Sequence, residues 1–204
     1  MRVAVRKEPL VRILKWARRA LFACAVLLLG YVGFVLVDAW VFQARESAIL
    51  DRQLRDRRAA SEAPPLRPVV ATDGLIGRVE IPRLKLSVMV VEGIGKTTLG
   101  RAAGHIPGTA LPGEPGNVGL AGHRHTLFRP LKDLRIKDEI RFSTPKGDFQ
   151  YEVESLRIVR PDNVGVLASS GKNVLTMVTC YPFFYIGAAP QRFIVRARQV
   201  SSVE

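Results

Sequence analysis

The chain has 204 residues, 48% of them hydrophobic, which is enough for one domain with its own core and additional segments. Its formal net charge of +13 would by itself suggest nucleic acid, an anionic membrane or an acidic substrate as a partner. About half of that excess lies in residues 1–19, which carry seven Lys or Arg and one Glu. The total charge therefore does not indicate a nucleic-acid-binding domain.

A basic segment, residues 1–19, is followed by a long apolar one, residues 20–37, with the sequence ALFACAVLLLGYVGFVLV. Eighteen residues without a charge, rising about 1.5 Å each as a helix, nearly cross a ~30 Å hydrocarbon core. Trp16 and Trp40 flank the segment as interfacial aromatics do. We expect a transmembrane signal anchor, because the segment is apolar on every face and is too long for a typical signal peptide.

The topology follows from the basic residues, which are more numerous before the apolar segment than after it. This bias predicts a single-pass protein of the cell membrane with a cytoplasmic N-terminus and an extracytoplasmic C-terminal domain. A buried soluble helix and a cleaved signal peptide are the alternatives. An exported domain is a poor candidate for binding nucleic acid. Its single cysteine, Cys180, would be an unpaired thiol in an oxidising compartment, so it needs burial or a chemical task.

Residues 38–73 are expected to form a helical stalk and a Pro-rich linker, and residues 74–204 a separate domain. Within that domain, short runs rich in Val and Ile are separated by Gly, Pro, Asp and Asn, which is typical of strands. Two short helical turns are expected at residues 97–102 and 126–134. These features predict a mainly β fold, a closed or nearly closed barrel. The candidate strands are residues 76–81, 87–93, 117–123, 139–144, 149–159, 174–180 and 192–200.

Cys180 ends one apolar run and is followed by a Tyr-Pro turn signal. A reactive thiolate needs a nearby base or cation, and the chain offers His105, His123 and His125, with Arg192 opening the next strand. From the residues alone, a thiol hydrolase, a thiol transpeptidase, a redox protein and an inert core thiol all stay open. The redox interpretation is the weakest because there is no CxxC. Metal binding is also weakly indicated, since the histidines lack obvious partner ligands.

Three motifs, separated along the chain, resemble those of a known enzyme family. The segment TMVTCYPF (176–183) resembles the strand end that carries the cysteine of sortases. The segment GHIPGTALPGEPGNVGLAGHRHTLFRPLKDL (104–134) resembles the region around their histidine, and APQRFIVRA (189–197) the strand with their arginine. The VTCYPF and GxAPxRFIV forms are most similar to class D sortases.

Carried over by position, the resemblance implies that Cys180 is the nucleophile, His123 the general acid/base and Arg192 the transition-state stabiliser. The sequence departs from the family pattern at three places. Met177 replaces a commoner Leu, and His125 stands where class D sequences often have Asp. IKDEI (136–140) lacks the Gly that commonly precedes its Asp, which we expect to affect only a turn.

The resemblance also implies an eight-stranded sortase-type β-barrel with one or two short helices after the transmembrane helix. The implied reaction is cleavage of a C-terminal Leu-Pro-x-Thr-Gly-like sorting signal through a thioacyl-enzyme, followed by transfer to an amine. That amine would come from a peptidoglycan precursor or a pilin lysine. No cofactor or metal is expected, and calcium has no support in the sequence. A membrane-tethered thiol protease that releases surface proteins by hydrolysis and a non-catalytic peptide-binding barrel are the alternatives.

Overall fold

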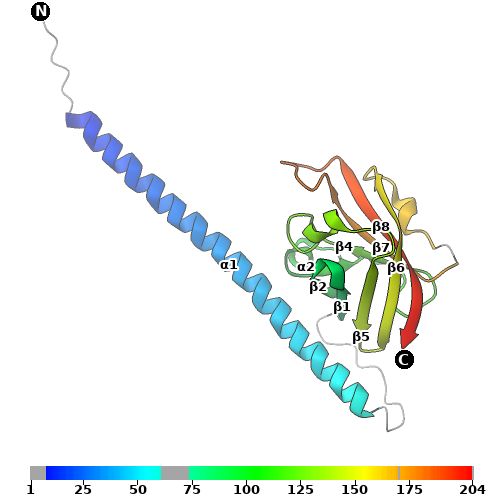
Figure 1. The fold of residues 1–204 in the computed structure, drawn as a ribbon. Helices are drawn as coiled ribbons and strands as arrows, with labels where there is room; N and C mark the ends of the chain where they lie inside the picture. Colours follow the sequence, from blue (N-terminus) through cyan, green and yellow to red (C-terminus); the bar gives the residue numbers. More distant parts are fainter. Residues whose placement is uncertain (1–7, 61–73, 170, 204) are drawn as a thin grey trace, which may run out of the picture. The chain divides into compact units, whose positions relative to one another are not determined.

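A computed structural model describes residues 8–60, 74–169 and 171–203 (Figure 1). Two compact units make up the chain, Met1–Trp40 and Val41–Glu204. The basic residues before position 8 and the Pro-rich part of the expected linker, residues 61–73, lie outside the described residues.

The described chain begins with α1, Glu8–Ala60, one helix of 53 residues. The expected membrane segment and stalk join in this helix, because no proline lies between Pro9 in its first turn and Pro64 beyond its end. By length and composition, the stretch Lys15–Arg52 within α1 is a candidate membrane span, and the apolar window that qualifies it is not buried by the rest of the protein. Trp16 and Trp40, the expected interfacial aromatics, are both exposed.

The second unit holds a closed barrel of eight strands in the order β1-β2-β3-β4-β7-β8-β6-β5, as the resemblance implies. The pairs β2–β3 and β4–β7 are parallel, and the other neighbours are antiparallel. The strands are β1 (Leu75–Ile81), β2 (Leu86–Glu92), β3 (Ala103–His105), β4 (Asn117–Ala121), β5 (Glu139–Thr144), β6 (Gly147–Val159), β7 (Val174–Tyr181) and β8 (Gln191–Val203). The short helices are α2 (Lys96–Arg101) and the 3-10 helices η1 (Pro82–Leu84), η2 (Arg129–Asp133) and η3 (Val164–Leu167).

The seven candidate strands all have counterparts, and β3 is the one that the sequence did not indicate. It has only three residues, Ala-Gly-His, without an apolar pattern of its own. Its strand character comes from pairing with β2 on one side and β4 on the other. The expected helical turns correspond to α2 and η2.

The barrel core is formed by strand residues that alternate between buried and partly exposed positions. Every second side chain of β1 is buried, and the first half of β6 follows the same period of two. Inward side chains of the strands, among them Tyr151 and Phe142, form one cluster with Phe128 from the turn before η2, and each of these three is at most 1% exposed. This packed interior holds the strand ends in fixed positions, which a site at those ends requires.

The part of α1 that belongs to the second unit packs on the outside of β1 and β2. Leu50 is fully buried in a small cluster with Leu75 and Met89. The side chain of Gln43 accepts a hydrogen bond from the backbone N–H of Met89 at 3.0 Å and donates one to the carbonyl of Arg101. Part of the segment expected to be a helical stalk therefore packs on the barrel.

Candidate active site

Two of the three predicted site residues face each other across neighbouring strands. In the antiparallel pair of β7 and β8, Cys180 lies directly opposite Arg192. Side chains of directly opposed residues project from the same face with Cβ atoms about 4.5–5.5 Å apart. Both residues are partly exposed.

His123 comes to the same end of the barrel through a different strand. The parallel pair of β4 and β7 aligns Ala121 with Val178, and His123 and Cys180 each lie two residues further on. The alignment continues past β4, because the N–H of Gly122 donates to the carbonyl of Val178 at 3.2 Å. The hydroxyl of Thr179 donates to the carbonyl of Gly122 at 2.7 Å. The imidazole of His123 is exposed at the ends of β4 and β7.

The remaining two histidines have different surroundings. His105 is 3% exposed, with Nδ1 at 2.7 Å from a carboxylate oxygen of Glu92 and Nε2 at 3.0 Å from the carbonyl of Ala110. It therefore ties β3 to the loop that leads to β4. His125 is exposed, and its Nε2 accepts a hydrogen bond of 2.9 Å from Nε of Arg124.

Arg124 lies beside the predicted site residues, and the sequence did not indicate it. It stands between His123 and His125, yet only 5% of it is exposed. Its Nη2 donates to the carbonyls of Tyr185 at 2.9 Å and Gly187 at 3.1 Å. No signal in the sequence separates this arginine from an ordinary solvated one, because the two carbonyls that it binds belong to residues more than sixty positions away.

The loop between β7 and β8, residues 182–190, borders the three predicted residues. Phe183 at its start packs with Tyr181 and Phe193, with ring centroids 5.3–6.4 Å apart. Phe184 and Ile186 beyond it are 74% and 100% exposed. The loop thus has an anchored base and an apolar exposed tip beside the site.

The guanidinium of Arg192 is hydrogen-bonded to the end of this loop. Its Nη1 donates to the carbonyls of Ala189 at 3.2 Å and Gln191 at 2.9 Å. These bonds orient the arginine from the backbone of its own strand and loop. Such a group, held beside a nucleophile, can stabilise negative charge that develops on a carbonyl oxygen.

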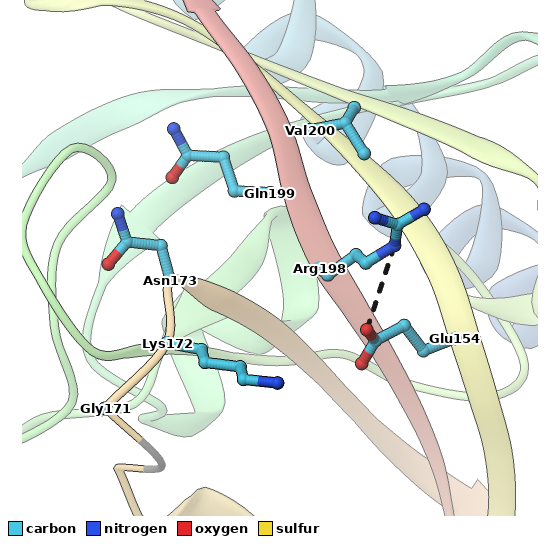
Figure 2. A pocket seen from close by; sticks show the side chains of 7 residues that line it. All are labelled: Glu154, Gly171, Lys172, Asn173, Arg198, Gln199 and Val200. Carbon is cyan, nitrogen blue, oxygen red and sulfur yellow. Dashed lines mark ion pairs between the residues drawn. The ribbon is translucent and has the colours of Figure 1, made fainter.

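A cavity of about 620 Å³ lies away from these residues. Lys172, Arg198 and Glu154 are among its lining side chains, and Figure 2 shows the ion pair between the last two. Asn173, just before the start of β7, also lines it, so it lies toward the end of β7 opposite to Cys180. In the described part of the chain no group of three or more His, Cys, Asp or Glu side chains is placed to hold a metal ion.

Comparisons with known proteins agree on one family. The model of the sortase domain matches residues 79–200. Sortase D of Bacillus subtilis (strain 168) is 28% identical over 199 residues, which cover 89% of this chain and 96% of that protein. Among solved structures, a Clostridium perfringens Sortase D5 transpeptidase is 26% identical with a TM-score of 0.61, covering 78% of this chain and 96% of that one. Sortase C1 of Streptococcus agalactiae is 30% identical with a TM-score of 0.60, covering 65% and 72%.

Proposed function

The chain belongs to the sortase family and is an enzyme of the sortase transpeptidase type, and from this premise we propose a specific reaction for it. The protein cleaves a C-terminal Leu-Pro-x-Thr-Gly-like sorting signal and transfers the substrate protein to an amine. Cys180 is the nucleophile, His123 the general acid/base and Arg192 the stabiliser of the oxyanion. The alignment of these residues at the ends of β4, β7 and β8 is the observation that carries the proposal.

The first half-reaction forms a thioester. The Cys180 thiolate attacks the carbonyl carbon of the signal's Thr, and the carbonyl oxygen takes up the negative charge beside Arg192. When the tetrahedral intermediate collapses, the C–N bond to Gly breaks and His123 gives its proton to the departing amine. The substrate protein is left joined to the sulfur of Cys180.

The second half-reaction restores the enzyme. An amine from a peptidoglycan precursor or a pilin lysine loses a proton to His123 and attacks the thioester carbonyl. A new amide bond forms as the C–S bond breaks, and the thiolate of Cys180 is regenerated. The rate should have a bell-shaped pH dependence, since thiolate and imidazolium are needed together.

The class, the domain limits and the location are parts of the same proposal. The VTCYPF and GxAPxRFIV forms and the likeness to Sortase D of Bacillus subtilis favour class D. Residues 74–204 form the catalytic domain, residues 38–73 join it to the membrane, and residues 20–37 span the membrane with residues 1–19 in the cytoplasm. The apolar stretch of α1 supports this anchoring.

The test uses the full chain in detergent with a Leu-Pro-x-Thr-Gly peptide. Mass spectrometry should detect an acyl-enzyme in the wild type and in Cys24→Ala, which removes the other cysteine, but none in Cys180→Ala. Added triglycine should convert the cleaved peptide into a ligated one, whereas a thiol protease would give the hydrolysed product even with the amine present. Cleavage by Cys180→Ala at a rate comparable to the wild type would overturn the assignment.

A further inference from the structure

We propose that Arg124 is a positioning residue that locks the β7–β8 loop and, through this loop, sets the place of the Arg192 guanidinium. The inference rests on the proposed function, because that function assigns the oxyanion to Arg192. Arg124 does not touch the reacting atoms in this proposal. It acts on the backbone to which Arg192 is hydrogen-bonded.

The first support is the kind of burial that Arg124 has. Arg124 as a residue is 5% exposed, so its guanidinium has lost most of its hydration, which is costly unless other groups replace the water. The replacements described for Arg124 are two carbonyls, the imidazole of His125 and the ring of Tyr185, whose centroid is 5.8 Å away. Three of these four contacts are to the β7–β8 loop or its side chains, so the burial of Arg124 depends on that loop being docked.

The second support is an incomplete set of hydrogen bonds. Nη1 of Arg124 is buried and has no hydrogen-bond partner among the residues that the structure describes. An unsatisfied buried donor lowers stability, and groups of this kind call for a reason other than stability. Control of a functional loop is such a reason, because proteins depart from full hydrogen-bond satisfaction mainly at functional sites.

The third support is the spacing of the carbonyls. Arg124 binds those of Tyr185 and Gly187, and Arg192 binds those of Ala189 and Gln191. Four alternate carbonyls of one short segment are therefore held by two arginines. Gly187, the second residue of the first pair, has φ +95°, a left-handed conformation that other residues adopt only with strain. Release of the first pair frees the chain that leads directly to the second pair.

The proposal predicts a loss of loop protection without any substrate. In the full chain, Arg124→Ala should raise amide hydrogen exchange of residues 183–191 by about tenfold or more, with unchanged exchange in β1, β2 and β5. Arg141→Ala is the matched control, because Arg141 also has a side-chain partner, Glu139, but lies on β5. It should leave exchange of the loop unchanged.

The kinetic prediction concerns the acylation step at saturating peptide, expressed per active site from the acyl-enzyme burst. Arg124→Ala should lower this rate about tenfold to a hundredfold, because small misplacements of a catalytic group cost that much. Arg124→Lys should recover part of it, since an ammonium can donate to both carbonyls but lacks the planar fork that also reaches His125. A residue that only stabilises the fold would reduce the number of active sites and leave the rate of each unchanged.

Two outcomes would overturn the proposal. The first is an Arg124→Ala variant whose β7–β8 loop exchanges its amide hydrogens as slowly as in the wild type. The second is an Arg124→Ala variant whose loop exchanges faster but whose acylation rate per active site stays within about twofold of the wild type. If Arg124→Ala does not fold, Gly187→Ala keeps the arginine and strains the loop residue whose carbonyl it binds, and normal exchange and acylation in that variant would overturn the proposal too. A wild type that forms no acyl-enzyme contradicts the proposed function instead, and the exchange experiment still decides whether Arg124 locks the loop.

Discussion

The glycine immediately before His123 provides the sharpest stability prediction. A Cβ added at Gly122 would lie 2.6–2.8 Å from three carbon atoms of the Phe128 ring. Ordinary contacts begin near 3.4 Å, so either the ring or the backbone has to move by about 0.8 Å. Neither moves freely. Phe128 is fully buried, the N–H of Gly122 donates to the carbonyl of Val178, and the carbonyl of Gly122 accepts from the hydroxyl of Thr179.

Gly122→Ala should therefore destabilise the protein by about 1–3 kcal/mol, the usual cost of overpacking a core. For a domain of this size that corresponds to a fall in Tm of roughly 3–15 °C. Acylation should slow by about tenfold or more, because the N–H of Phe128 donates to the carbonyl of His123 at 3.1 Å and a displaced ring moves the histidine.

The assay is thermal unfolding together with the rate of acyl-enzyme formation. Gly100→Ala is the control: a Cβ at this position in α2 meets nothing within 4 Å, and the substitution should be neutral or slightly stabilising. Phe128→Leu should relieve the clash, so the double variant should be little less stable than Phe128→Leu alone. A Tm for Gly122→Ala within about 1 °C of the wild type, or strictly additive losses in the double variant, would refute the reasoning.

Three further predictions concern the barrel. Lys137 has φ +72°, a left-handed conformation that favours Gly, so Lys137→Gly should stabilise the protein by up to about 1 kcal/mol in denaturant unfolding, and a clear loss of stability would contradict this. The hydrogen-bonded guanidinium of Arg83, at 2.6 Å, lowers the pKa of the Asp138 carboxyl below its usual 3.8. The stability that this carboxylate contributes is present above pH 3.8 and is lost as the pH falls through its lowered pKa. Below pH 3.8, Tm should therefore fall more steeply with pH in the wild type than in Asp138→Asn. Equal slopes in the two proteins would contradict a contribution from the ionised Asp138. Asn117→Ala should cost about 1–3 kcal/mol in the same unfolding assay, because it leaves the buried hydroxyl of Thr176 without its acceptor at 2.8 Å; an unchanged midpoint would show that the hydroxyl finds another partner.

The long strands could be predicted because their pattern is local. Residues 149–159 were expected from alternation, and β6 runs over Gly147–Val159. The expected run at 174–180 corresponds to β7, Val174–Tyr181. β3 could not be predicted in this way, since three residues have too few side chains to show a period and form a strand only between two partners.

For the predicted site residues, the limit of local sequence patterns is that they do not show which strand ends are neighbours. Cys180 was a candidate nucleophile from its place at a strand end, but nothing local indicates which other strand ends lie beside it. The resemblance to sortases named His123 and Arg192, and these roles stay predictions. The parallel pairing of β4 with β7 and the antiparallel pairing of β7 with β8 bring the three positions together. Arg124 was missed because a charged loop residue is usually solvated, and its burial depends on a loop some sixty residues away.

By itself the sequence determined the apolar helix, the strand-rich domain and the motifs of the family, because these depend on residue type and short spacing along one chain. The tertiary structure decided which strand ends are neighbours, that part of α1 docks on β1 and β2, and that Arg124 binds the β7–β8 loop. Those features arise from contacts between segments far apart in the sequence. Such contacts are selected by the packing of the whole barrel, and no local pattern records them.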